Sequence, residues 1–118
     1  NLSNPESSSG SGGLELRQGI VRIEGDDTGL ILDGLLRITG GTLDMASGTG
    51  NGNNFIEYSV SGNAEIDITD GTLDVGSQVR RGLLSTSGVL KYTQSGGVAR
   101  FGINTAPEQN RGVFKCWK

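Results

Sequence analysis

The chain has no histidine, a single cysteine and only two prolines, and each shortage excludes a class of structure or chemistry. Without histidine, the sequence lacks the commonest general base and the commonest zinc ligand. Because Cys116 is the only cysteine, no intrachain disulfide can form. Two prolines are too few for a collagen pattern or a proline-rich linker. The sequence therefore points away from disulfide scaffolds and collagen-like repeats.

Aromatic residues, concentrated positive charge and long apolar runs are also scarce. Aromatic residues make up 5% and hydrophobic residues 33% of the chain, which is low for a compact two-layer globule. The ten basic residues are scattered and the net charge is -3, so we expect no nucleic-acid partner, since phosphate binding requires a concentrated basic face. No run of apolar residues reaches about 18, so no membrane span is expected.

Glycine, by contrast, is abundant, with 21 copies in 118 residues. Average usage is about 7%, and glycine reaches positive φ without steric cost, so this excess indicates many tight turns. Residues 35–39, 64–69 and 89–93 alternate apolar and polar side chains with a period of two, which is typical of strands. We therefore predict an all-β protein with little or no helix, preceded by a flexible Ser/Gly-rich leader at residues 1–13.

The strongest signal is an internal repeat. Residues 36–45, LRITGGTLDM, match residues 66–75, IDITDGTLDV. A third copy at residues 90–101 follows the same order if Gln94 and Ser95 are treated as an insertion. The repeat is marked by turn glycines that lie 30 and 26 residues apart: Gly41, Gly71 and Gly97.

A second phase of this repeat is carried by residues 53–56, 81–84 and 111–114, which begin 28 and 30 residues apart. A strand rises about 3.3 Å per residue, so three short strands with their corners account for one period. One such unit cannot bury its apolar face alone, and stacking of equivalent units provides the core. We therefore predict a parallel β-helix fragment at residues 14–118, with about four coils of 26–30 residues and three short strands per coil, continuing beyond residue 118 in a parent protein. A β-sandwich is the alternative.

The alternation assigns apolar residues to inward-facing columns, in which equivalent positions of successive coils are stacked. All twelve of these positions are apolar or aromatic, as a structural inner ladder requires. The predicted columns are Leu36/Ile66/Leu90, Ile38/Ile68/Tyr92, Leu43/Leu73/Ala99 and Met45/Val75/Phe101.

The outward columns are polar or charged. The predicted column Arg37/Asp67/Lys91 alternates in sign, and a register slip would place like charges together, so the alternation favours one alignment of the coils.

Asp44 and Asp74 form a column of like charge. Two carboxylates about 5 Å apart could bind calcium, act as an acid/base pair, or be solvated on the surface. Because Arg100 follows in the next coil and offsets the charge, we interpret the column as repetition of the coil. Asp44 and Asp74 remain weak candidates for a calcium site, and we expect no catalytic residue and no cofactor.

The segments GGTLDM at residues 40–45 and DGTLDV at residues 70–75 resemble the GGTL-type repeats of right-handed parallel β-helix passengers, as in autotransporters. Residues 102–114 are similar to repeat regions of very large secreted surface proteins of Bacteroidota, some of them gliding or adhesion proteins. The resemblance covers about residues 34–114 and implies a right-handed solenoid that serves as a cell-surface stalk or adhesin. The family also includes polysaccharide-degrading enzymes, whose catalytic constellations have no clear counterpart in this chain.

We therefore expect a structural or adhesive spacer of a secreted or bacterial cell-surface protein, and not an enzyme. Its expected partners are neighbouring coils of the parent protein, a second copy, surface glycans or other cell-surface proteins. Self-association is expected through an open C-terminal edge carrying Val113, Phe114 and Trp117.

Two alternative functions remain open at the level of the sequence. A polysaccharide lyase or hydrolase would place four aspartates in a groove on one sheet: Asp44, Asp67, Asp70 and Asp74. A carbohydrate-binding module would need an exposed aromatic side chain, for which Tyr58 is the candidate.

Overall fold

The computed structural model describes residues 13–24, 29–47, 54–58, 63–81 and 89–103. Within these residues every regular element is a β-strand and no helix is present. The same residues contain no helix long and apolar enough to cross a membrane. The prediction of an all-β structure without helix is therefore confirmed for the described part of the chain.

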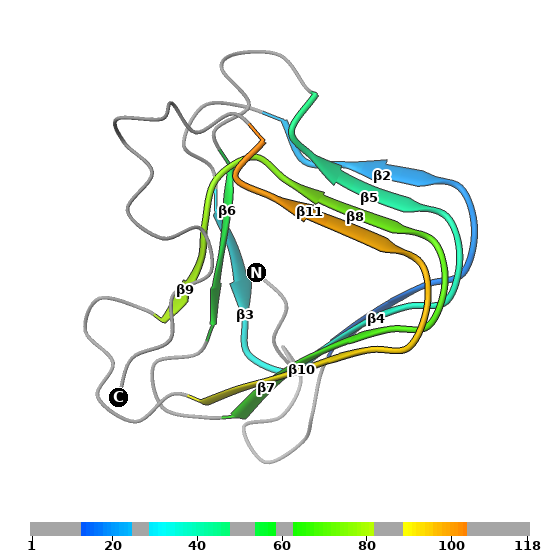
Figure 1. Cartoon of the computed structure of the whole chain (residues 1–118). Coiled ribbons are helices and arrows are strands. Elements are labelled where there is room, and N and C mark those ends of the chain that lie inside the picture. Colours follow the sequence, from blue (N-terminus) through cyan, green and yellow to red (C-terminus); the bar gives the residue numbers. More distant parts are fainter. Residues whose placement is uncertain (1–12, 25–28, 48–53, 59–62, 82–88, 104–118) are drawn as a thin grey trace.

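The strands of this part form three sheets, which occupy three sides of a triangle in Figure 1. The first sheet contains β1 (Gly13–Leu16), β4 (Leu35–Ile38), β7 (Asn63–Ile68) and β10 (Val89–Gln94), in this order. The second sheet contains β2 (Ile20–Arg22), β5 (Thr42–Met45), β8 (Thr72–Val75) and β11 (Val98–Phe101). The third sheet contains β3 (Gly29–Leu32), β6 (Phe55–Tyr58) and β9 (Val79–Arg81).

The chain visits the three sheets in turn, so that consecutive strands such as β4, β5 and β6 make up one layer. Every pairing between the described strands is parallel and joins equivalent positions of adjacent layers. In particular, Ile38 pairs with Ile68, which the sandwich alternative would have placed on strands that are not neighbours. The prediction of parallel, layer-on-layer strand pairing is therefore confirmed.

Inward-facing side chains of the strands other than β2 form one apolar core inside the triangle. Tyr92 and Phe101, on the strands that end their sheets, contact each other edge to face, with ring centroids 6.1 Å apart. The inner-ladder residues with no exposed area are Leu36, Ile38, Leu43, Met45, Ile66, Ile68, Leu73 and Val75. Those that are partly buried and pack against this core are Leu90, Tyr92, Ala99 and Phe101.

The corner between the first and second sheets is a column of stacked glycines. All four glycines have positive φ. The residue that follows Gly41, Gly71 or Gly97 donates its backbone N–H to the carbonyl oxygen of the glycine in the layer before, at 2.8, 2.8 and 2.9 Å, respectively. A Cβ atom on Gly71 would lie only 2.6 Å from the carbonyl oxygen of Gly41. Both the left-handed backbone and the close approach of the layers therefore require glycine here. The glycines are Gly19, Gly41, Gly71 and Gly97.

The register of β10 differs from the sequence-based prediction. Leu90 was the expected partner of Ile66, but the structure pairs Ile66 with Tyr92 and moves Gln94 into the strand. Gly97 stacks on Gly71 at the corner, and this contact fixes the C-terminal end of β10. Gln94 therefore pairs with Ile68 as part of β10, and no residues are inserted between the strand and the turn. A period-two pattern cannot detect a shift of two residues, because the same side chains still face inward.

Two further parts of the structure differ from the repeat as the sequence showed it. The resemblance began at about residue 34, yet Leu14 pairs with Leu36 and Val21 pairs with Leu43, so β1, β2 and β3 form a layer that precedes it. In the third sheet, residues 53–56 do not correspond to residues 81–84, because Ile56 pairs with Val79. The sequence did not reveal these two pairings because the layers differ in length. Equivalent positions lie 22, 30 or 26 residues apart in the first two sheets and 23 residues apart between β6 and β9.

Gly71→Ala should destabilise the protein more than Gly19→Ala. Both substitutions place alanine at positive φ, which costs about 1–2 kcal/mol, but nothing lies within 4 Å of a Cβ atom at Gly19. At Gly71 the added methyl group would also force adjacent layers apart. Urea unfolding of the two variants at low protein concentration measures the difference, and equal destabilisation would contradict the role of close layer contact.

Leu73→Ala should lower the free energy of unfolding by about 2–5 kcal/mol, because its side chain is fully buried in a layer with neighbours on both sides. The matched control is the adjacent Thr72→Ala, whose side chain points outward and whose loss should cost no more than about 0.5 kcal/mol. Urea unfolding monitored by circular dichroism tests both, and similar costs for the two variants would show that the inward and outward faces are assigned incorrectly.

Candidate functional site

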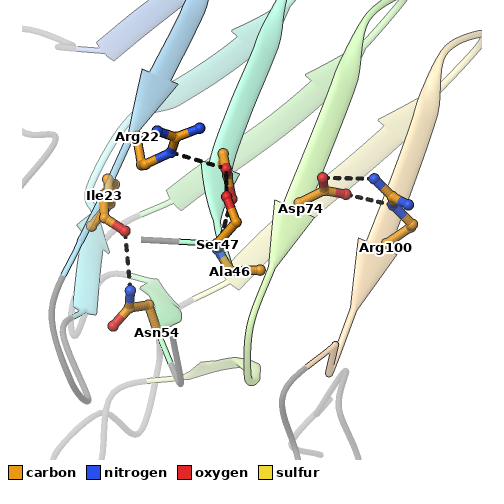
Figure 2. A network of polar contacts seen from close by, with 8 residues as sticks. Arg22, Ile23, Ala46, Ser47, Asn54, Asp74 and Arg100 are labelled. Atoms are coloured by element: carbon orange, nitrogen blue, oxygen red, sulfur yellow. Dashed lines mark hydrogen bonds and ion pairs between the residues drawn. The ribbon is translucent and has the colours of Figure 1, made fainter. Parts of the chain in front are cut away.

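Four charged residues are stacked in one column on the outer face of the second sheet, one from each of β2, β5, β8 and β11. Arg22 Nε donates a hydrogen bond to Asp44 Oδ2 at 3.2 Å. Arg100 donates from Nε and Nη2 to the two carboxylate oxygens of Asp74, at 2.6 and 2.8 Å (Figure 2). The column therefore reads Arg–Asp–Asp–Arg and consists of two ion pairs, each formed between adjacent layers. We call Arg22, Asp44, Asp74 and Arg100 the charged column.

Asp44 is buried, with 7% of its surface exposed, because the chain turns around its carboxylate directly after β5. Its Oδ1 accepts hydrogen bonds from the backbone N–H groups of Ala46 and Ser47, at 2.9 and 3.0 Å, and its Oδ2 accepts one from the Ser47 hydroxyl. Burial by itself raises the pKa of Asp44. The Ser47 hydroxyl, the two backbone N–H groups and the Arg22 guanidinium together outweigh burial and lower the pKa to about 2.

Asp74 begins an identical Asp-x-x-Ser segment but is held differently. The N–H of Ser77 donates to the carbonyl of Asn54 in the layer before, at 2.8 Å, whereas Asp74 takes both of its arginine bonds from the layer after. The hydrogen bond to Asp74, followed by the negative charge of its carboxylate, raises the pKa of Arg100. The same sequence motif therefore forms an interlayer ion pair in both layers, from Asp44 to the layer before and from Asp74 to the layer after, and the Asp44 carboxylate also accepts hydrogen bonds from its own turn.

Asp44 and Asp74 are the residues for which a calcium site or an acid/base pair was considered. They are stacked as predicted, but each carboxylate is bonded to its own arginine. A cation would have to compete with these guanidinium groups. A general acid or base works best with a pKa near the operating pH, whereas the pKa of Asp44 is about 2. The contacts therefore favour a structural role for this pair.

No group of three or more histidine, cysteine, aspartate or glutamate side chains that could hold a metal ion is found among the described residues.

The outer faces of the other two sheets also carry ion pairs between layers. On the first sheet, Arg37 Nε lies 3.1 Å from Asp67 Oδ2, in the column that the sequence predicted. Lys91, which was expected to continue that column, instead pairs with Glu65, at 3.9 Å, because β10 is shifted by two residues. On the third sheet, an equivalent ion pair joins Arg80 to Glu57, at 3.0 Å.

The four aspartates that an enzyme would need on one sheet lie on two. Asp67 belongs to β7 of the first sheet, and Asp70 follows it in the corner turn, where its Oδ1 accepts the N–H of Gly71 at 2.8 Å. Asp44 and Asp74 belong to the second sheet. The structure therefore does not bring the four carboxylates into one groove.

The aromatic residue expected to be exposed is buried. Tyr58 is 5% exposed and belongs to the core, so the prediction of an exposed aromatic platform at this position was wrong. The aromatic side chain on the outer face of the third sheet is Phe55, whose ring lies against Gly29 and beneath the guanidinium of Arg80, 4.1 Å from the ring centroid. The alternation in the segment FIEY places Phe55 opposite to Ile56, and this signal could have identified Phe55.

Asn54 is a second residue whose role the sequence did not reveal. It has no exposed area, and its Nδ2 donates to the carbonyl of Ile23 in the layer before, at 3.1 Å (Figure 2). The backbone carbonyl of Asn54 accepts a hydrogen bond from the N–H of Ser77 in the layer after. Asn54 therefore connects three layers at the corner between the second and third sheets.

A pocket of about 480 Å³ lies over the beginning of β4, β7 and β10. It has no aromatic residue in its lining, and the two charged residues that line it, Glu65 and Lys91, are paired with each other. This pocket therefore offers little of the chemistry that an acidic or neutral polysaccharide substrate requires.

No family model matches the chain, and neither a curated protein nor a solved structure does. The residues of the expected C-terminal edge, Val113, Phe114 and Trp117, lie outside the described part of the chain, as does Cys116. The function must therefore be argued from the layered geometry.

Asp44→Asn should destabilise the protein at neutral pH by about 2 kcal/mol, since each pKa unit corresponds to about 1.4 kcal/mol. The folded-state pKa of Asp44, about 2, lies below the ordinary value of 3.8. Ionised Asp44 therefore stabilises the fold above pH ~4, and this contribution is lost as the pH falls towards ~2. Urea unfolding of wild type and variant across this range should show a difference that shrinks with decreasing pH.

The matched control for this measurement is Asp70→Asn, because an asparagine oxygen can accept the same bond from Gly71. Its effect should be small throughout. A destabilisation by Asp44→Asn that stays constant between neutral pH and pH ~2 would contradict the assigned role of the Asp44 carboxylate.

Proposed function

We propose that the chain is a segment of a right-handed parallel β-helix and that it serves as a structural or adhesive spacer in a large secreted or cell-surface bacterial protein. The proposed architecture is supported by strands that visit three parallel sheets in turn and return one layer further on. The proposed handedness follows from the general rule that crossovers between parallel strands of one sheet are right-handed in about 98% of cases.

The observation that carries this proposal is that polar side chains connect layers on all three outer faces. The pairs Arg22–Asp44, Arg37–Asp67 and Arg80–Glu57 each join adjacent layers of a different sheet. Charged side chains paired in this way are engaged with each other and are not poised to act on a substrate as acid and base. A stack in which each repeat contacts only its neighbours can be lengthened without changing its interior, and this property suits a spacer.

The secreted or cell-surface location rests on the resemblance of residues 40–45 and 70–75 to the repeats of β-helix passengers. An adhesive role would use the outer faces, where the pairs of opposite charge leave a mixed surface without a strong field of one sign. This surface is compatible with glycans or other cell-surface proteins as partners.

The competing functions are less well supported by the geometry. A polysaccharide-active enzyme is disfavoured by the division of Asp44, Asp67, Asp70 and Asp74 between two sheets. A carbohydrate-binding module is disfavoured because Tyr58 is buried and the outward-facing Phe55 is covered by Arg80.

An activity screen on acidic and neutral polysaccharides tests the proposal. The wild-type chain should release no reducing ends and form no unsaturated products, whether or not it binds the same immobilised polysaccharides. Turnover that is abolished by Asp74→Ala and retained by the neighbouring Thr72→Ala would overturn the structural role. Thr72→Ala is the matched control because it lies on the same strand and the same outer face, two residues away.

A further inference from the structure

The two edge strands of the second sheet differ from its inner strands at one outward column. This column runs through Ile20, Thr42, Thr72 and Val98, from β2 to β11. The two inner layers carry threonine, whereas the two terminal layers carry β-branched apolar residues that are 68% and 51% exposed, respectively. Ile20 and Val98 are therefore the positions at which this column would continue into a further layer.

Several other columns also end in groups that would fit each other. Continuing the register of the existing layers would place Leu14 of one copy over Tyr92 of another, and Val21 over Ala99. Tyr92 and Ala99 are only partly buried, although the residues at equivalent positions in the inner layers are fully buried. A further layer on this edge would complete the burial of both.

The glycine corner continues in the same way. Gly19 has a left-handed φ of +82°, like the other stacked glycines, yet nothing lies within 4 Å of its Cβ position, and β2 is the last described strand on this side of the second sheet. Placed over Gly97 of another copy, Gly19 would make the contact that Gly41 makes with Gly19. The N–H of Ile20 would then reach the carbonyl of Gly97, which accepts a hydrogen bond of 3.3 Å from the side-chain amide of Gln94.

We propose that the N-terminal edge of one copy, formed by β1 and β2, stacks on the C-terminal edge of a second copy, formed by β10 and β11. The inference rests on the proposed solenoid architecture and extends it from one chain to an assembly. Such a head-to-tail contact is heterologous and does not close, so it produces linear oligomers.

One contact in this stack is repulsive. The charged column ends in arginine at both edges, so Arg22 of one copy would lie over Arg100 of the other. Each arginine keeps its own aspartate on the opposite side, Asp44 and Asp74, which reduces the repulsion. Exposed charge pairs of this kind change an equilibrium by about two- to fivefold. Because salt screens the repulsion while leaving apolar contacts intact, association should become tighter as ionic strength increases.

The test uses two variants of the full chain, each of which blocks one edge. Ile20→Lys places a charge on the N-terminal edge, and Val98→Lys places one on the C-terminal edge. By sedimentation equilibrium, the wild type should form concentration-dependent oligomers, each variant alone should lose at least ~90% of its association, and an equimolar mixture should form a 1:1 dimer. The dimer is expected because the mixture still contains one intact edge of each kind.

Three further variants serve as controls. Thr72→Lys adds the same charge to the same column in an inner layer, and its association should match that of the wild type. Gly19→Asn should block the N-terminal edge sterically, since asparagine tolerates positive φ and nothing in its own copy opposes its Cβ atom. Arg22→Gln should tighten association by about two- to fivefold and remove most of its salt dependence.

A wild-type chain that remains monomeric at millimolar concentration overturns the stacking. So does a mixture of the two lysine variants that stays monomeric while the wild type associates, because that result indicates a symmetric contact between like edges. Neither result changes the proposed spacer role, because the polysaccharide screen tests that role on the single chain. Failure of the stacking proposal can therefore be distinguished from failure of the proposed function.

Discussion

The close approach of successive layers at the glycine corner is the constraint on which the rest of the structure depends. There the main chain of one layer lies directly on the main chain of the next, with Gly71 against the carbonyl of Gly41 and no room for a side chain between them. This contact sets the distance between layers and the starting point of every strand in the second sheet. It also aligns the first sheet from its C-terminal end, as the register of β10 shows. Differences in layer length are therefore absorbed at the other two corners.

The charged side chains act within this frame and not independently of it. Exposed ion pairs contribute little to stability, typically about 0.2–1 kcal/mol each. Their greater effect is on specificity, because a shift of one layer by one residue would separate Arg22 from Asp44 and turn the outward columns into the core. Asp44 is an exception, since it is buried and accepts hydrogen bonds from two backbone N–H groups and the Ser47 hydroxyl. It connects the end of β5 to the neighbouring layer and holds the turn that follows.

The proposed spacer role and the proposed stacking of copies both follow from the equivalence of the layers. A middle layer presents the same groups to the layers on either side, and for this reason its carboxylates are occupied and its apolar residues are enclosed. The terminal layers present those groups to one side only, so Ile20 and Val98 remain exposed. The unpaired apolar groups are therefore concentrated at the edges of the stack, whereas the charged residues of the outer faces are largely paired with one another.

The sequence by itself determined the all-β class of structure and the inward faces of β4, β5, β7, β8, β10 and β11, because glycine spacing and period-two alternation are local properties of the chain. It identified Gly41, Gly71 and Gly97 as the repeating turn, and it placed Asp44 beside Asp74. Only the tertiary structure decided which residues lie one above another where layer lengths differ. Tyr92 over Ile66, the first layer beginning at Gly13, and the corner role of Asn54 depend on contacts across 22 to 31 residues. A shift of two residues leaves the alternation unchanged, and only the fit of one main chain against the next distinguishes the two alignments.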